Sequence, residues 1–111
     1  MKVYGLPNCD SCRSARKALQ AADIAHEFID LRTRPPDTDT LAHWLTELGE
    51  QALVNRRSTT WRGLDEATRN RPAAQLLAAE PTLIKRPVLT DGKRVHCGGR
   101  EPDWLAFAQP R

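Results

Sequence analysis

Residues 7–13 read PNCDSCR, which places Cys9 and Cys12 three residues apart. A cysteine thiolate is a nucleophile and a metal ligand, so this spacing fits a redox pair or half of a metal site. Two small apolar residues buried side by side are a third interpretation. In a reducing compartment, a C-x-x-C pair is more often catalytic, redox-sensing or metal-binding than a structural disulfide. Three cysteines, an odd number, do not indicate a secreted disulfide framework.

The position of Cys9 favours chemistry over packing. It lies between a strand predicted at residues 2–5 and a helix predicted over about residues 11–22, which Asp10 or Ser11 could cap. The first turn of a helix offers unpaired amides and about half a positive charge. Both stabilise a thiolate over a thiol, so Cys9 is the predicted nucleophile.

Cys12 is placed to complete a redox cycle. It lies three residues after Cys9, close enough to attack a mixed disulfide there and release the product. Arg13 and Arg16, in the first turns of the same predicted helix, could add positive charge near the thiolate.

Two other uses of these cysteines fit the sequence less well. A zinc site would recruit Cys97 and His96, but neighbouring side chains on a strand point to opposite faces. A phosphatase loop of the C-x5-R type needs an arginine at the sixth position after Cys9, where Ala15 stands. A nucleophile with a resolving thiol, and no metal, is therefore the favoured interpretation.

The remaining elements are predicted from hydrophobic spacing and from turn residues. A second strand is expected within residues 25–32, and two helices are expected to begin near Asp37 and at Pro72. Residues 86–97 indicate a β-hairpin around a two-residue Asp91–Gly92 turn. Pro102 is expected to open the last helix. Two tryptophans on apolar helix faces are expected in the core, namely Trp44 and Trp104.

Length and composition bound the class of protein. At 111 residues the chain fits one domain, and 17 basic against 14 acidic residues give a mild charge of +3 that barely favours a nucleic-acid partner. No apolar run approaches the roughly 18 residues that a membrane helix needs. The first ten residues lack the apolar core of a secretory signal, so we expect a cytoplasmic protein with no membrane partner.

The order strand, helix, strand, helices, hairpin, helix is similar to the thioredoxin-type plan. With the stretches YGLPNCDSCRSARKAL, ALVNRRSTTWRGL and LIKRPVL, the chain resembles the ArsC/Spx family over nearly its whole length. The resemblance implies an α/β, thioredoxin-like fold with a mixed four-stranded sheet. It implies one domain, with a core at residues 1–36 and 81–111 and a helical insertion at 37–80. It also implies that Pro87 follows a cis peptide bond and faces the redox cysteine.

The resemblance assigns roles to individual residues. Family arsenate reductases attack arsenate with one cysteine, matched here by Cys9, and bind the oxyanion with three arginines. Arg86, before the proline, matches one of them and would orient the substrate. The second position falls near Asn55, and the third falls near Cys97. One arginine of the three is thus retained, which favours a substrate other than arsenate.

The resemblance is closest to the YffB-type branch, which implies a glutathione-dependent thiol reductase. Cys12 or external glutathione would resolve the intermediate, and glutathione with glutaredoxin, or thioredoxin, would be the reductant; no bound cofactor is expected. Two alternatives stay open: a true arsenate reductase, and an Spx-like redox-sensing regulator that binds the α-subunit of RNA polymerase. The expected substrate-binding residues are Asn8, Arg13, Asn55, Arg56 and Pro87, and Cys97 is either a second resolving thiol or a buried inert one.

Overall fold

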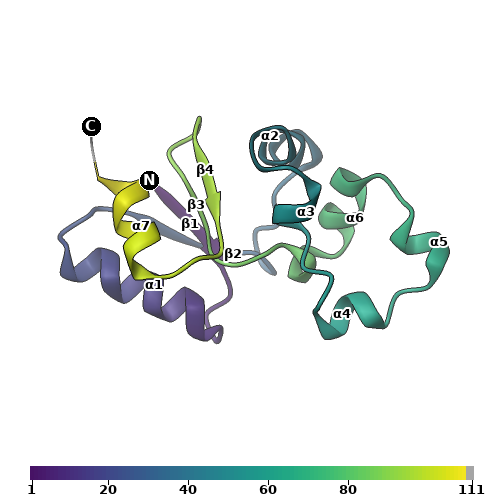
Figure 1. Ribbon diagram of the computed structural model, residues 1–111, viewed down its shortest axis with the longest axis horizontal. Coiled ribbons are helices and arrows are strands. Elements are labelled where there is room, and N and C mark those ends of the chain that lie inside the picture. Colours follow the sequence, from purple (N-terminus) through teal and green to yellow (C-terminus); the bar gives the residue numbers. More distant parts are fainter. Residues whose placement is uncertain (110–111) are drawn as a thin grey trace.

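A computed structural model describes residues 1–109 as a four-stranded mixed sheet with helices on both faces (Figure 1). The molecule is elongated, with principal extents of 44 × 26 × 23 Å. The elements in chain order are β1 (Lys2–Gly5), α1 (Asp10–Ala21), β2 (Glu27–Asp30), α2 (Thr38–Leu48), α3 (Glu50–Leu53), α4 (Thr59–Arg62), α5 (Glu66–Arg69), α6 (Ala73–Ala79), the 3₁₀ helix η1 (Pro81–Leu83), β3 (Val88–Thr90), β4 (Val95–Cys97) and α7 (Glu101–Ala108).

The sheet order is β2-β1-β3-β4, with β1 at its centre. β1 pairs parallel with β2, which is reached through α1, and antiparallel with β3; β3 and β4 form an antiparallel hairpin. The mixed four-stranded α/β sheet expected from the sequence is confirmed. The strand order also brings the end of β1, which leads into the cysteines, beside the start of β3, which follows Arg86–Pro87.

Alternate side chains of the central strands supply two hydrophobic clusters. Val3 and Leu89 pack on one face against α1 and α7, together with the buried Trp104. Val88 points to the other face, where Trp44 of α2 lies in the second cluster. Both tryptophans are nearly inaccessible, at 1% and 3% relative exposure, so the prediction that they belong to the core is confirmed.

Helices α2 to α6 fill the segment between β2 and β3 and extend to one side of the sheet (Figure 1). The Asp37 side chain caps α2 by accepting a hydrogen bond from the Thr40 amide at 2.8 Å, and Gly49 ends the helix with a φ of 85°. The Trp44 ring meets the Tyr4 ring of β1 edge-on, with centroids 4.8 Å apart. This contact joins the helical segment to the sheet. The division into a sheet core and an insertion within one domain stays a prediction.

Several boundaries differ from the sequence-based expectation. β2 is shorter than the predicted 25–32 segment. The two-residue hairpin turn is wrong: Thr90 pairs with Val95, which leaves a four-residue loop at 91–94. The Asp91 carboxylate accepts from the amides of Lys93 and Arg94, and this side-chain closure replaces the tight turn that Asp-Gly usually indicates.

Candidate active site

Cys9 is the N-cap residue of α1, one position earlier than the predicted cap. Its backbone is extended, its carbonyl accepts the first helical hydrogen bond from the Arg13 amide at 3.0 Å, and the helix has no side-chain cap. Asp10, expected as a possible cap, is instead the first helical residue. The Cys9 sulfur, half-buried, therefore lies where a capping oxygen usually lies, next to the free amides of the first turn.

Cys12 is fully buried beneath Cys9, on the inner face of α1. Its sulfur packs directly against Gly5, the last residue of β1, where even a Cβ atom would overlap it. Helix α1 can approach the strand this closely only because position 5 carries no side chain. Gly5 is thus a structural requirement of the site, and its signal in the sequence was a glycine ending the strand that leads to the cysteines.

Arg86 lies near Cys9 in space although it is 77 positions later in the sequence. It lies two residues before β3, and its guanidinium is close enough to the Cys9 sulfur to lower the pKa of that thiol. Its Nη1 donates to the Thr82 carbonyl at 2.8 Å, which holds the side chain in place. Its Nε is buried without a hydrogen-bond partner among the described residues. An unpaired buried donor beside a nucleophile can receive an anionic or carbonyl group of a substrate.

The two thiols have opposite acidities. Burial raises the pKa of Cys9, but the Cys12 amide, the Arg86 guanidinium and the Cys12 thiol together outweigh it and hold that pKa below the ordinary value. Burial, followed by the nearby Cys9 charge, raises the pKa of Cys12 to about 11 despite the Leu6 hydrogen bond. At neutral pH the pair therefore presents one favoured thiolate, at Cys9, and one thiol, at Cys12.

Pro87 follows Arg86 directly and is a buried part of the same site. The Arg86–Pro87 bond is cis, and Pro87 is fully buried. Its carbonyl accepts a hydrogen bond from the Gly98 amide at 2.9 Å, which fastens the end of the hairpin to the site. The structure thus brings Cys9, Cys12, Arg86 and Pro87 together.

Two residues expected to bind substrate beside the cysteines are exposed at the surface. Asn8 is exposed, with no side-chain hydrogen bond among the described residues. Arg13 is exposed and paired with Asp10, and it is not among the groups that shift the pKa of Cys9. Arg16 stacks on Phe28, with its guanidinium carbon 4.2 Å from the ring centroid, so it too is engaged elsewhere.

The middle motif is also engaged in local structure. The Asn55 side chain accepts from the Arg57 amide at 3.1 Å and so closes a turn, while its backbone amide donates to the Leu83 carbonyl at 2.7 Å. Arg56 pairs with Glu50 at 2.8 Å. The substrate-binding roles of Asn55 and Arg56 stay predictions, and neither guanidinium nor amide contributes to the pKa of Cys9.

Cys97 lies on β4 with its thiol donating to the Ala52 carbonyl at 3.3 Å. Burial raises the pKa of this thiol, and the charge of Lys85 opposes the shift. Lys85 also packs its carbons against Gly98, so a lysine occupies the neighbourhood where the third family arginine was sought. Neither Lys85 nor Thr82, which anchors Arg86, was singled out from the sequence, although Lys85 lies within the LIKRPVL stretch.

Residues 1–109 contain no group of three or more His, Cys, Asp or Glu side chains that could hold a metal ion. Within the same range, no helix is both long and apolar enough to span a membrane.

Comparisons with protein families and with known sequences point to the same family. The model of the ArsC family matches residues 4–107. An uncharacterised protein of Haemophilus influenzae is 40% identical over 108 residues, which cover 94% of this chain and 95% of that protein. The global transcriptional regulator Spx 1 of Lactococcus lactis is 33% identical over 111 residues, covering 95% of this chain and 86% of the regulator.

Solved structures agree with the sequence relatives. The YFFB (PA3664) protein is 35% identical with a TM-score of 0.88, covering 97% of this chain and 98% of that one. An arsenate reductase (ArsC) related protein from Brucella melitensis is 32% identical with a TM-score of 0.73, covering 96% of this chain and 92% of that one. The thioredoxin-like fold and the resemblance drawn from the sequence are confirmed: this chain belongs to the ArsC family.

Proposed function

We propose that this chain is a thiol-dependent oxidoreductase that reduces glutathione mixed disulfides, with Cys9 as nucleophile. One observation carries the proposal: the Cys9 sulfur lies at the amide end of α1, against a guanidinium whose Nε is buried and unpaired. This arrangement favours the thiolate and leaves a donor free for the substrate.

The first step is thiol–disulfide exchange. The Cys9 thiolate attacks one sulfur of a disulfide G–S–S–R, where G–S is the glutathionyl group. A Cys9–S–S–G bond forms as the S–S bond of the substrate breaks, and R–S⁻ leaves and takes a proton from solvent. The Arg86 guanidinium would orient a carboxylate of the glutathionyl group, and the first-turn amides would stabilise negative charge on the sulfurs.

The second step can follow two routes. A free glutathione thiolate can attack the glutathionyl sulfur, which restores Cys9 and releases oxidised glutathione. Alternatively, Cys12 loses its proton and attacks Cys9, releasing glutathione thiolate and forming a Cys9–Cys12 disulfide. At a pKa of about 11, only about one Cys12 in 10,000 is ionised at pH 7. The mixed disulfide removes the Cys9 charge that helps to raise this pKa, so Cys12 becomes a better nucleophile at the moment when it is needed.

The electron donor in this proposal is glutathione, acting with glutaredoxin, and thioredoxin would reduce a Cys9–Cys12 disulfide. Such a cycle belongs in the reducing cytoplasm, where the glutathione pool keeps thiols reduced.

A second candidate is a redox-sensing regulator that binds the α-subunit of RNA polymerase. The 33% identity to Spx 1 over nearly the whole chain favours it, as does the retained C-x-x-C pair. In this case the Cys9–Cys12 disulfide would change binding and no turnover would be needed. Arsenate reduction is less favoured, because Asn55 and Cys97 stand near the positions of two oxyanion arginines in the family.

The test is a coupled assay that follows NADPH oxidation with glutathione, glutathione reductase and the purified chain. The substrates are a glutathione mixed disulfide of 2-mercaptoethanol and, separately, arsenate with glutaredoxin added. We expect turnover with the mixed disulfide, none with arsenate, and none from the Cys9→Ser variant with either.

The same preparations, reduced and oxidised, are tested for binding to the RNA polymerase α-subunit. Arsenate-dependent turnover lost in Cys9→Ser would replace the proposal with arsenate reduction. Absence of all turnover, together with α-subunit binding that changes with oxidation, would replace it with the regulator.

A further inference from the structure

A cavity of about 590 Å³ opens at the amino end of β1, within the range of small-molecule sites. Three segments enclose it: the start of β1, the first turns of α2, and the beginning of the hairpin loop. The lining residues used below are Lys2, Tyr4, Asp39, His43, Trp44 and Asp91.

This cavity is separate from the cysteine site. Lys2 begins β1 and Gly5, which contacts Cys12, ends it, so these two residues lie about 10 Å apart along the strand, and Tyr4 between them lines the cavity. Neither Cys9 nor Arg86 lines the cavity. Its use does not depend on the redox function proposed above.

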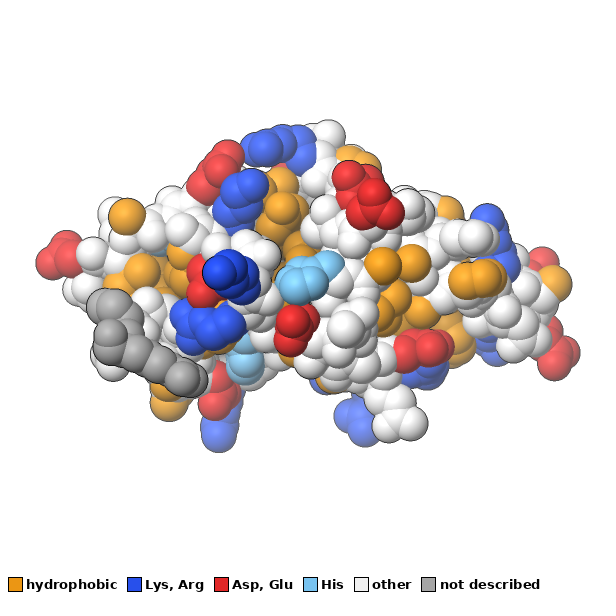
Figure 2. All heavy atoms as spheres, turned by 90° about the horizontal axis from the view of Figure 1, so that it is seen from above, with side chains coloured by type: hydrophobic (Ala, Val, Ile, Leu, Met, Phe, Trp, Pro, Cys, Tyr) orange, Lys and Arg blue, Asp and Glu red, His pale blue; other side chains and the backbone are white. Residues whose placement is uncertain are grey.

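The inner wall is aromatic. Tyr4 and Trp44 meet edge-on at 4.8 Å, and Trp44 is held rigidly in the core at 1% exposure. Seen from the side of α2 and the hairpin, hydrophobic atoms show between the sheet and the helical part, with a histidine and charged side chains of both signs nearby (Figure 2). Such a surface favours an apolar group of a ligand.

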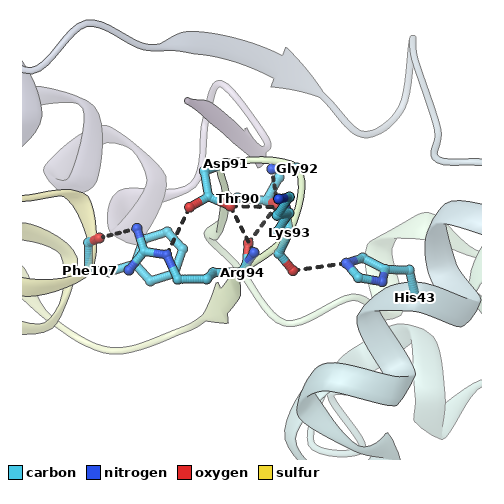
Figure 3. A network of polar contacts seen from close by, with 7 residues as sticks. All are labelled: His43, Thr90, Asp91, Gly92, Lys93, Arg94 and Phe107. Carbon is cyan, nitrogen blue, oxygen red and sulfur yellow. Dashed lines mark hydrogen bonds and ion pairs between the residues drawn. The ribbon is translucent and has the colours of Figure 1, made fainter. Parts of the chain in front are cut away.

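The hairpin wall is preformed, and its carboxylate is already in use. Asp91 accepts from the amides of Lys93 and Arg94 and from the Arg94 Nε at 2.8 Å (Figure 3). The Thr90 hydroxyl donates to the Arg94 carbonyl and accepts from the Gly92 amide. These bonds make the loop a fixed boundary and leave Asp91 no charge to offer a ligand.

Two other charged side chains at the cavity have no ion-pair partner among residues 1–109, in addition to the chain's first residue, Met1, which also lines it. Lys2 and Asp39 line it from opposite elements, β1 and α2, yet they do not pair with each other. The ion pairs within residues 1–109 join Arg13 to Asp10, Arg34 to Glu27, Arg56 to Glu50 and Arg94 to Asp91. One cavity therefore has an unpaired cation on one wall and an unpaired carboxylate on another.

His43 adds an acceptor on the carboxylate side. Its ring points from α2 to the hairpin, with Nε2 2.9 Å from the Lys93 carbonyl oxygen (Figure 3). A carbonyl can only accept, so Nε2 carries the proton in this contact, and Nδ1 is the ring nitrogen that can face a ligand. His43 lies four residues after Asp39, on the same face of the helix. α2 thus presents two acceptors, and β1 presents one cationic donor.

We propose that this cavity is a binding site for a short zwitterionic peptide with apolar side chains. The free ammonium group of the peptide binds between Asp39 and His43, its carboxylate binds Lys2, and its side chains pack on Tyr4, which the buried Trp44 supports from behind. A purely anionic ligand would leave Asp39 facing negative charge, and a purely cationic one would leave Lys2 facing positive charge.

The probe is the dipeptide Leu-Phe, compared with its N-acetyl and C-terminal amide forms. The N-acetyl form lacks the ammonium group and the amide form lacks the carboxylate, while the side chains stay the same. Each is titrated into the full ¹⁵N-labelled chain, and the Trp44 indole and loop amide NMR signals are followed. The free dipeptide should bind roughly tenfold more tightly than either blocked form.

Variants of the protein test which residue binds each end of the peptide. Asp39→Asn should remove the advantage over the N-acetyl form, and Lys2→Gln the advantage over the amide form. Glu47→Gln on the outer side of α2 and Lys17→Gln on α1 remove the same charges from exposed positions outside the cavity, and should change nothing. Reductase activity and melting temperature should stay at wild-type values in all four.

Three results would overturn the proposal. They are the absence of saturable shifts for the free dipeptide up to roughly 10 mM, equal affinity for all three peptides, and an Asp39→Asn variant that still discriminates against the N-acetyl form. Equal affinities would mean that apolar packing alone holds the ligand. Loss of the Trp44 signals in a variant would indicate misfolding. In that case a Lys2→Met/Asp39→Asn double variant with native spectra replaces it, and a double variant that still prefers the free dipeptide to both blocked forms would overturn the proposal.

Discussion

The two ends of β1 carry sites of opposite character. At the carboxyl end, Gly5 lets the Cys12 sulfur pack without a gap, and Arg86 is held against Cys9 by the Thr82 carbonyl. At the amino end, the chain leaves a cavity of about 590 Å³, where Lys2 and Asp39 form no ion pair within residues 1–109. The same strand thus packs tightly against the cysteine site at one end and borders an open cavity at the other.

The difference follows from what each kind of site must do. A thiolate is stabilised by groups within hydrogen-bonding distance in a partly dry corner, so tight packing favours it. A binding site needs volume and groups that no intramolecular partner has neutralised. Substitutions at the carboxyl end should therefore change reactivity steeply, whereas those at the amino end should change ligand affinity alone.

The largest effect is expected from Cys9→Ser. Loss of the thiolate should lower the reduction of glutathione mixed disulfides by about a thousandfold or more. Cys12→Ser should cost about tenfold or less, because external glutathione can resolve the intermediate. Steady-state rates in the NADPH-coupled assay measure both, with Cys97→Ser as the control that should stay near wild type. Equal losses from Cys9→Ser and Cys12→Ser would show that the two thiols act as one unit.

Arg86→Met should have the next largest effect, about 10- to 100-fold at pH 7. In the wild type, attack by Cys9 should increase with pH through a pKa below the ordinary thiol value and then level off. Without the guanidinium the pKa of Cys9 increases, so the whole profile should move to higher pH. Thiolate absorbance at 240 nm against pH, in a Cys12→Ser, Cys97→Ser background, measures this shift directly. An unchanged profile would mean that the helix amides alone set the pKa of Cys9.

Gly5→Ala should affect stability more than chemistry. The added methyl would overlap the Cys12 sulfur, and overpacking of this kind typically costs about 1–3 kcal/mol of unfolding free energy. Urea unfolding measures the loss. Cys12→Ala removes the sulfur, so the double variant should recover much of the cost that Gly5→Ala causes. Additive losses in this double-mutant cycle would show that α1 shifts away instead.

Arg13→Gln should have the smallest effect. Its ion pair with Asp10 is exposed on both sides, with side-chain exposures of 61% and 93%, and such pairs contribute under about 1 kcal/mol. The pKa of Cys9 should not change, since Arg13 is paired with Asp10 and is not among the groups that shift this pKa. A shift as large as that of Arg86→Met would make Arg13 part of the thiolate environment after all.

The local part of the active site could be predicted from the sequence, and its long-range part could not. Strand, C-x-x-C and helix follow one another in the chain, so the nucleophile at the helix start needed no tertiary information. Arg86 and Pro87 were placed by family resemblance rather than by spacing, because 77 residues separate Arg86 from Cys9 in the chain. Asn55 and Arg56 were reasonable candidates by type, yet their side chains bond to nearby groups in their own segment.

The sequence by itself determined the family, the order of the elements and the candidate nucleophile, because hydrophobic spacing and short motifs express local physics. Only the tertiary structure decided which arginine meets the thiolate, why position 5 must be glycine, and that Asp91 closes a four-residue loop. It alone placed Lys2 and Asp39 at one cavity. Side-chain partners depend on which segments the fold brings together, and a hydrogen bond or charge contact reaches only a few ångströms in space, however far apart the residues are in the chain.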